Sequence, residues 1–260
     1  AANKGLKMTT SDYVILLNSD TIVSQGWLEN LIECAESDPK IGIVSPLSNA
    51  ASWQSVPEVM QGDRFAINDL PEGYTVDDMA QLIRSISQLH FPRVSFLNGF
   101  CFCIKRATIN SIGYFDEKAF PQGYGEENDY CLRAIEAGFE LAIADQAYIY
   151  HAKSKSYGSQ KRAELAKAGS KALEQKHGKE NISKKLKIIK SMPALEEIRK
   201  RVKASLANKK KLDLKSKSHV YQFAILFILP AKGGGGGCHS VVQEAKGINK
   251  LGVRAQIAIP

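Results

Sequence analysis

The sequence lacks any apolar run long enough to cross a membrane. The longest, residues 220–230, is shorter than the ~20 residues that a spanning helix needs, so we predict a buried strand there. Residues 1–10 have neither the basic nor the apolar part of a signal peptide. We therefore expect a cytoplasmic location, with the inner face of the cell membrane as a further expectation. Because the first residue is Ala1 rather than methionine, we also expect a piece of a longer chain.

Paired cysteines are missing too. The five cysteines form no CxxC pair, which argues against a structural zinc site and against a disulfide framework. Cys101 and Cys103 alternate within an apolar run, so on a strand both would face the same side. We predict that they pack in the core as reduced thiols.

Aromatic residues are scarce where positive charge is dense. Residues 152–219 hold 21 lysines and arginines against six aspartates and glutamates, yet Tyr157 is the only aromatic residue of 153–217. The segment therefore has too few aromatic side chains to bind nucleic acid by base stacking. Steeply salt-dependent DNA binding would nevertheless support the nucleic-acid alternative. The expected interpretation is a solvated helical connector that can lie near an anionic membrane, with no specific nucleic-acid partner.

What is present is a β-α-β order in a chain whose 44% hydrophobic content suffices for a core. Residues 12–18 predict a strand buried on both faces, 24–37 a helix and 41–44 a strand. Residues 49–74 predict a long surface excursion. These elements indicate an α/β fold with a mainly parallel sheet.

Further elements follow along the chain. Residues 75–90 predict a helix whose Thr75 and Asp78 resemble a capping box, with Asp in place of Glu or Gln. Residues 93–105 predict two strands broken at Gly99, and residues 107–112 a short helix ended by Gly113. Residues 126–137 predict a helix, 140–150 a strand, and 158–190 and 195–211 two basic helices.

Three motifs carry candidate chemistry. Asn18-Ser19-Asp20-Thr21 lies where a buried strand runs into its loop, the place where open α/β sheets bind ligands, although Asp20 could equally be a turn residue. Residues 123–133 (GYGEENDYCLR) bring three carboxylates onto a first helical turn, where they could also simply satisfy the helix dipole. His151 follows an apolar strand, and a lone histidine there is often structural.

Taken together, in the order NSDT, NGFCFCIKR, IGYFDE, GYGEEND and a strand ending in histidine, these motifs resemble the family 2 glycosyltransferases of the GT-A fold. The resemblance covers residues 1–190, and is greatest to bacterial rhamnosyl- and galactofuranosyltransferase-like members. It implies transfer of a sugar from a nucleotide-diphosphate donor to a glycan or lipid-linked glycan acceptor, with inversion, in polysaccharide or cell-envelope glycan synthesis. It also implies that the first β-α units, which hold the nucleotide base, precede this chain.

By that resemblance, Asp20 matches the last acid of the family's metal motif, and His151 the histidine that completes the metal site. Asn18 and Ser19 match the donor-binding part of the motif, although Asn18 stands where many members have an aspartate. The implied cofactor is Mg²⁺ or Mn²⁺.

The same resemblance implies the catalytic and acceptor residues. Glu126 and Glu127 match the family's Glu-Asp pair, whose second member is the general base, with glutamate in place of the commoner aspartate. Asn98, Gly99 and Asp129 are expected to shape the acceptor pocket.

The end of the chain resembles the start of a family 4 glycosyltransferase domain of the GT-B fold. Residues 220–260 contain an apolar strand, a glycine run that includes Gly234, Gly235 and Gly236, and a helix-like and a strand-like segment. A flexible linker is the alternative for the glycine run. The expected organisation is a partial GT-A domain with a mixed sheet flanked by helices (1–190), a basic helical linker (191–219) and the first β-α-β of a Rossmann-like GT-B domain (220–260).

Three other functions stay open at this point. Asp20 and Glu127 could be the paired carboxylates of a glycoside hydrolase, which would cleave glycans without a donor. The chain could also be a carbohydrate-binding module, or a catalytically inactive fragment. Transfer assays with and without Glu127→Gln would separate these alternatives.

Overall fold

The centre of the molecule is a mixed seven-stranded sheet. The computed structural model describes residues 2–121, 123–153, 159–207, 223–228 and 254–258. The strands of the sheet lie in the order β11-β10-β1-β7-β3-β8-β6. Their bounds are β1 Tyr13–Asn18, β3 Ile41–Leu47, β6 Arg93–Val94, β7 Cys101–Lys105, β8 Glu140–Tyr148, β10 Phe223–Ile228 and β11 Arg254–Ala258.

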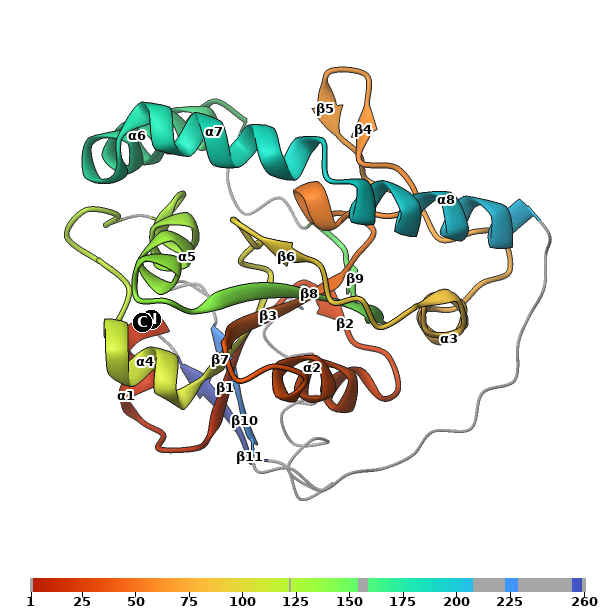
Figure 1. Cartoon of the computed structure of the whole chain (residues 1–260), viewed down its shortest axis with the longest axis horizontal. Coiled ribbons are helices and arrows are strands. Elements are labelled where there is room, and N and C mark those ends of the chain that lie inside the picture. The colour runs from red at the N-terminus through yellow and green to blue at the C-terminus, as the bar shows by residue number, and fades with distance from the viewer. Residues whose placement is uncertain (1, 122, 154–158, 208–222, 229–253, 259–260) are drawn as a thin grey trace.

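Helices cover both faces of this sheet (Figure 1). They are α1 Ala2–Lys7, α2 Trp27–Glu36, α3 Val76–Ile86, α4 Arg106–Ile112, α5 Glu126–Glu136, α6 Ser159–His177, α7 Lys179–Lys190 and α8 Pro193–Ala207. Alternate residues of β1 serve two separate cores: Val14 packs in one cluster with residues of α3, α5 and α8, and Ile15 in the other with α2. Side chains buried as fully as these each contribute about 1.5–3 kcal/mol to stability.

Several local predictions are confirmed. Thr75 caps α3 through a complete capping box with Asp78, so Asp serves in the place usually taken by Glu or Gln. Gly113 ends α4 with a positive φ of 73°. Cys101 and Cys103 are fully buried on β7, and burial raises the pKa of the Cys103 thiol to about 12. These thiols are core residues, as predicted.

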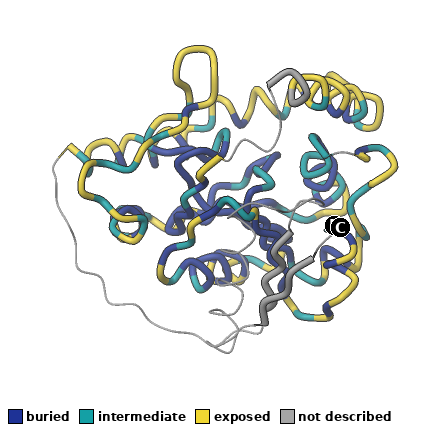
Figure 2. Tube along the Cα trace, turned by 180° about the vertical axis from the view of Figure 1, so that it is seen from behind, coloured by how far each residue is buried: buried dark blue, intermediate teal, exposed yellow. Residues whose placement is uncertain are grey.

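The excursion between β3 and α3 is partly built into the fold. It contains a 3-10 helix, η1 Ser52–Gln54, and a hairpin of β4 Met60–Gln61 and β5 Arg64–Phe65. Figure 2 shows this hairpin as an exposed projection, whereas the residues before it are mostly buried. The surface location predicted for 49–74 is therefore correct for the hairpin and not for the segment that precedes it.

The strands predicted to open a second domain extend the same sheet. β10 pairs in parallel with β1 from Tyr13↔Phe223 to Asn18↔Ile228, and β11 pairs in parallel with β10. The predicted glycine run with Gly234, Gly235 and Gly236, and the helix-like segment after it, lie outside the described residues. The division into two transferase domains stays a prediction.

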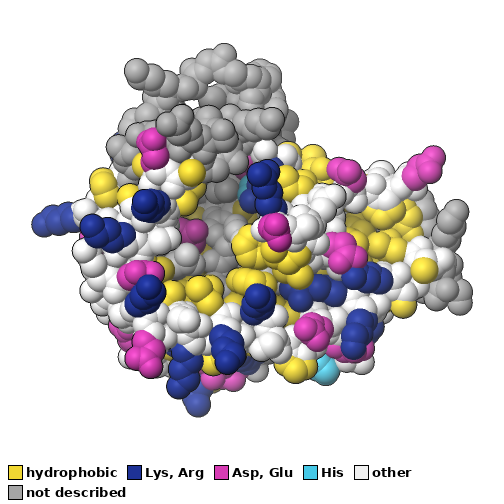
Figure 3. All heavy atoms as spheres, turned by 90° about the horizontal axis from the view of Figure 1, so that it is seen from above, with side chains coloured by type: hydrophobic (Ala, Val, Ile, Leu, Met, Phe, Trp, Pro, Cys, Tyr) yellow, Lys and Arg dark blue, Asp and Glu magenta, His cyan; other side chains and the backbone are white. Residues whose placement is uncertain are grey.

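The basic segment forms three helices rather than two. Gly178, with a φ of 80°, separates α6 from α7, a break that the helical pattern of 158–190 did not indicate. Pro193 is the first residue of α8, where its missing N–H costs nothing. Figure 3, viewed from above onto this side, shows lysine and arginine side chains interspersed with exposed hydrophobic ones.

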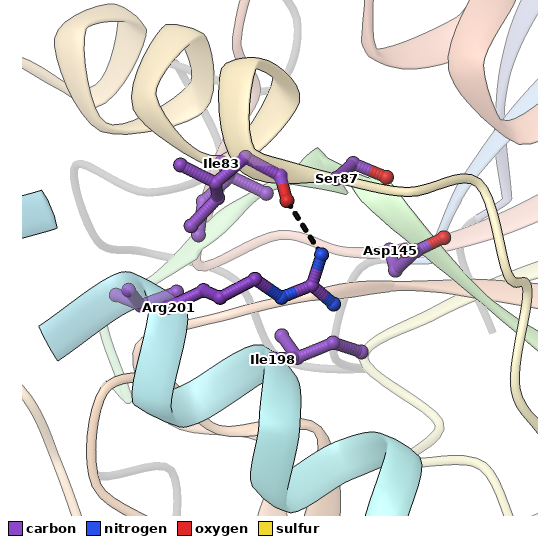
Figure 4. Close-up of a pocket in the computed structure, with 7 residues that line it drawn as sticks. Ile83, Ser87, Asp145, Ile198 and Arg201 are labelled. Atoms are coloured by element: carbon purple, nitrogen blue, oxygen red, sulfur yellow. Dashed lines mark hydrogen bonds between the residues drawn. The ribbon is translucent and has the colours of Figure 1, made fainter. Parts of the chain in front are cut away.

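α8 packs on the domain, so the described part of the predicted 191–219 linker is not a solvated connector. Its inward residues Leu195, Ile198 and Val202 are buried. Arg201 donates from Nη1 to the carbonyl of Ile86 at 2.8 Å, and Figure 4 shows its side chain between Ile198 and the end of α3. No described helix is both long and apolar enough to span a membrane.

Candidate functional site

A short strand pair brings Asp20 and His151 together. β2 (Thr21–Ile22) pairs antiparallel with β9 (Tyr150–His151), with Thr21 opposite His151. Asp20 Oδ1 then lies 3.3 Å from His151 Nε2. Asn18 and Ser19 precede Asp20 at the carboxyl end of β1. The two residues predicted to bind metal are therefore neighbours, although 131 positions separate them in the sequence.

The ring of His151 is held in one orientation. Its Nδ1 lies 3.0 Å from the carbonyl oxygen of Ala50, and the ring of Phe100 stacks on it at 5.3 Å. A carbonyl can only accept a hydrogen bond, so Nδ1 carries the hydrogen and Nε2 faces Asp20. Two electron-rich atoms at this distance need a cation or a proton between them. A carbonyl that orients the other ring nitrogen is also the usual support of a metal-binding histidine.

These residues fit a divalent ion that takes further ligands from its substrate. Among the described residues, no group of three or more His, Cys, Asp and Glu side chains could hold a metal by themselves. Mg²⁺ is commonly held by one or two carboxylates together with substrate phosphates. Asp20 and His151 would be the protein's ligands in such a site.

Glu127 lies at a second position, in the first turn of α5. The backbone N–H of Gly125 donates to Glu127 Oε2 at 3.3 Å. Gly99 packs against the same side chain so closely that a Cβ on it would lie 3.3 Å from the Cβ of Glu127. Glu127 lines a cavity of about 430 Å³ together with Asn98 and Asn128. Its carboxylate is therefore anchored and accessible.

The segment Asn98–Phe100 connects these two positions. Asn98 is fixed by Gln54, whose side-chain oxygen accepts from the Asn98 backbone N–H at 2.6 Å. Phe100, two residues later, stacks on His151, and its carbonyl accepts from the backbone N–H of Asn18 at 2.8 Å. Asp20 and His151 do not line the cavity that contains Glu127, among the described residues. The predicted metal and base residues thus both contact one segment, through Phe100 and Gly99.

Glu126 is in a different environment from Glu127. Burial and the neighbouring Glu127 charge raise the pKa of Glu126 to about 8. Its Oε2 is buried without a hydrogen-bond partner among the described residues. We therefore expect Glu126 to be mainly protonated at neutral pH.

The stability of the Glu126→Gln variant, compared with that of the wild type, is expected to be higher at pH 8 than at pH 5. The ordinary pKa of Glu126 is 4.5 and the folded value is about 8. Between these two pKa values the unfolded state binds fewer protons than the folded state, so the stability of the wild type falls as pH rises. The variant has no carboxyl group at this position and therefore does not lose that stability. Urea unfolding at both pH values measures the effect. An unchanged pH slope in the variant would contradict the buried, protonated state.

Asp129, predicted to bind the acceptor, is enclosed by basic side chains. Its carboxylate has 0% exposure, with Oδ1 2.8 Å from both Lys176 Nζ and His177 Nε2, and Oδ2 2.9 Å from Arg133 Nε. Burial raises the pKa of Asp129, but the hydrogen bonds from Lys176, His177 and Arg133 outweigh it and lower that pKa overall. Both oxygens are engaged, so this geometry favours a structural role that joins α5 to α6.

α6 also contacts the glycine loop before α5 directly. A Cβ on Gly169 would lie 1.5 Å from the carbonyl oxygen of Tyr124, which no side chain allows. Gly125, at a φ of 123°, also faces Gly169: a Cβ on Gly125 would lie 3.4 Å from the backbone carbonyl oxygen of Gly169. A glycine at position 169 therefore lets α6 pack against the loop that positions Glu127.

Sequence reasoning missed much of the cavity wall. Trp53 and Phe65, from the excursion, form an edge-to-face pair with ring centroids 5.0 Å apart. Ile182 and Leu186 come from α7. The sequence offered one signal for this wall, a tryptophan inside a polar excursion. It offered none for α7, because α7 has the pattern of a basic helix and nothing local shows what its apolar residues contact.

Comparisons with known proteins show which proteins this chain resembles. The chain is 29% identical over 153 residues to the pre-mycofactocin glycosyltransferase of Mycobacterium tuberculosis, covering 58% of this chain and 29% of that protein. It is 26% identical to the N-acetylglucosaminyl-diphospho-decaprenol L-rhamnosyltransferase of the same organism, covering 60% and 52%. It is 29% identical to the poly-beta-1,6-N-acetyl-D-glucosamine synthase of Staphylococcus aureus, covering 45% and 25%. The chain thus spans about half or less of the length of these relatives.

A family model described as glycosyltransferase like family 2 matches residues 1–170 of the 260. The mixed sheet flanked by helices is consistent with the GT-A fold. Because the match covers well over half of the chain, the chain belongs to the family 2-like glycosyltransferases.

Proposed function

We propose that this chain contains the metal-binding and catalytic residues of a metal-dependent, inverting transferase. The enzyme moves a sugar from a nucleotide-diphosphate donor to a hydroxyl of a glycan or lipid-linked acceptor, in polysaccharide or cell-envelope glycan synthesis. The observation that carries the proposal is that the Asp20–His151 pair and Glu127 contact neighbouring residues of one segment, Phe100 and Gly99. The curated relatives, whose names include a rhamnosyltransferase and a polysaccharide synthase, support the substrate class.

The donor side is assigned to the end of β1. Asp20 and His151 would hold a Mg²⁺ or Mn²⁺ ion, and Asn18 and Ser19 would contact the donor beside it. Such an ion neutralises the negative charge that develops on a leaving diphosphate. The Ala50 carbonyl keeps His151 Nε2 directed at this position.

The acceptor side is assigned to the cavity. Glu127 would take the proton of the acceptor hydroxyl as that hydroxyl attacks the sugar from the face opposite the diphosphate. Asn98 and Gly99 would position the acceptor. Glu126, in its protonated form, would add no second charge beside the base.

The basic surface of α7 also suggests where the enzyme acts, namely at the face of a membrane. α7 carries five lysines and one glutamate, and lies next to the cavity. Lysines in such a helix attract the anionic surface of a lipid bilayer. A lipid-linked acceptor would be reached most directly from such a surface.

Asp20→Ala is expected to raise the Mg²⁺ or Mn²⁺ concentration for half-maximal nucleotide release about 10- to 100-fold, as losses around metal sites do. Release of nucleoside diphosphate from a panel of sugar nucleotides is measured on the full-length protein. Asp12→Ala, at the exposed opposite end of β1, is the matched control and should behave as wild type. Unchanged metal dependence in Asp20→Ala would remove the proposed metal site. Glycan cleavage without any donor would point to a hydrolase instead.

A further inference from the structure

The strand pair that brings His151 to Asp20 leaves the N–H and carbonyl of His151 to be paired by another segment. Across the β2–β9 pair, the N–H of Ala152 donates to the carbonyl of Asp20 at 2.8 Å. Because bonded and non-bonded residue pairs alternate along an antiparallel ladder, the N–H and carbonyl of His151 itself point away from β2. β9 has only two residues, so the contacts on its second edge matter for how firmly the histidine is fixed.

A side-chain amide, that of Asn49, meets this second edge. The N–H of His151 donates to Asn49 Oδ1 at 2.7 Å, and Asn49 Nδ2 donates to the carbonyl of His151 at 3.2 Å. An amide has both an acceptor oxygen and donor hydrogens, so it pairs with the two backbone groups of His151 as a neighbouring strand would. Both residues are buried, where backbone groups without partners cost free energy.

The residues beside Asn49 complete this clasp. The carbonyl of Ala50 lies 3.0 Å from His151 Nδ1, so residues 49 and 50 contact the backbone and the ring of the same histidine. The hydroxyl of Ser48 donates to Asn49 Oδ1 at 3.2 Å and helps to hold the amide. The backbone contacts fix where the side chain of His151 begins. The Ala50 carbonyl then fixes which ring nitrogen faces Asp20.

We propose that Asn49 is a positioning residue for the reaction: it acts through His151, whose Nε2 it keeps directed at the ion that Asp20 would share. This inference rests on the proposed function for the role of His151 as a metal ligand. The clasp itself is testable without that role, because its hydrogen bonds join protein atoms alone. Groups that orient a metal-binding histidine typically change metal affinity or activity about 10- to 100-fold when they are lost.

Asn3 provides a matched control, because it makes the same kind of clasp elsewhere. Its Nδ2 donates to the carbonyl of Phe115 at 2.8 Å, and its Oδ1 accepts from the N–H of Phe115 at 2.8 Å. Asn3 is buried like Asn49, and Phe115 stacks on Tyr130 in the core. Loss of either clasp should lower stability, whereas only loss of the Asn49 clasp should disturb His151.

The first measurement is the tautomer of His151 in the full-length protein without added metal. NMR of ¹⁵N-labelled histidine at mildly alkaline pH, where a free imidazole is neutral, distinguishes a hydrogen on Nδ1 from one on Nε2. His151→Gln identifies the signal. Wild type and Asn3→Ala are expected to keep the hydrogen on Nδ1. Asn49→Ala is expected to populate both tautomers, because the ring is no longer held at the Ala50 carbonyl.

The second measurement is the Mn²⁺ concentration for half-maximal nucleotide release. Asn49→Ala should raise it about 10-fold, and Asn3→Ala should leave it unchanged. Ser48→Ala, which removes only a hydroxyl that holds the amide, is the milder variant if Asn49→Ala does not fold. It should raise the same concentration about two- to threefold, as the loss of one neutral hydrogen bond would.

A purely structural asparagine would give a different result. A lower stability of Asn49→Ala in urea, with the tautomer and the Mn²⁺ dependence both as in the wild type, would overturn the positioning role. Equal effects of Asn49→Ala and Asn3→Ala on these two readouts would overturn it as well. If Asn49→Ala does not fold, unchanged readouts in Ser48→Ala have the same consequence.

The positioning role and the proposed function fail in different ways. If Asn49→Ala changes the tautomer of His151 but neither Mn²⁺ nor Mg²⁺ affects nucleotide release, the orientation of His151 by Asn49 stands and the metal assignment fails. If Asp20→Ala shifts the metal dependence but Asn49→Ala leaves both readouts unchanged, the metal assignment stands and the inference about Asn49 is wrong.

Discussion

Glu127→Gln is expected to lower kcat for sugar transfer about 10²- to 10⁴-fold, the contribution typical of a well-placed general base. Glutamine keeps the size of the side chain but cannot accept a proton from the attacking hydroxyl. The Gly125 N–H can still donate to the amide oxygen, so the fold and donor binding should be retained. The measurement is steady-state transfer by the full-length protein, with donor affinity measured separately.

Glu174→Gln is the matched control, because Glu174 is another carboxylate on the wall of the same cavity. It is expected to change kcat by less than about tenfold, because it has no assigned part in proton transfer. Equal losses for the two variants would indicate a general effect of cavity charge. Retained activity in Glu127→Gln would remove the proposed base.

Asp129→Asn is expected to lower the free energy of unfolding by about 3 kcal/mol, the cost of breaking a buried ion pair on one side. The amide would leave Lys176 and His177 facing a buried group without charge. Since hydrogen bonds from Lys176, His177 and Arg133 lower the pKa of Asp129, the stabilisation is present above the ordinary pKa of an aspartate and is lost as pH falls below it. Urea unfolding at neutral pH measures the effect.

Glu136→Gln is the control for the same network. Its side chain is 59% exposed and lies 3.3 Å from His177 Nδ1, so its loss should cost less than about 1 kcal/mol. If Asp129→Asn instead kept full stability and raised only the KM for the acceptor, the acceptor role first predicted for Asp129 would be supported.

Secondary structure was largely readable because local patterns were strong. Residues 12–18 are apolar without a break, as a strand covered on both faces requires, and they form β1. Thr75 and Asp78 correctly predicted the start of α3, because side-chain capping depends only on residues that are close in the sequence. The break at Gly178 was not predicted, because a single glycine inside a helical pattern can either be tolerated or end the helix.

Contacts between distant segments were not readable in the same way. The three carboxylates of residues 126–129 have three different environments: Glu126 has a buried oxygen and a raised pKa, Glu127 lines the cavity, and Asp129 is enclosed by basic side chains. Helical spacing indicated only that Glu127 points to a different side from Glu126 and Asp129. It did not indicate that α6 would cover one of them, because the position of α6 depends on Gly169 and on packing far along the chain.

The sequence by itself determined the strand and helix order, the family and the candidate residues Asp20, Glu127 and His151, because these follow from local periodicity and ordered motifs. The tertiary structure decided which residues meet: Asp20 with His151 through β2 and β9, and Glu127 with an apolar wall supplied by the hairpin and α7. The physical reason is that the environment of a side chain depends on packing between segments that lie far apart in the sequence, and no local pattern encodes that packing.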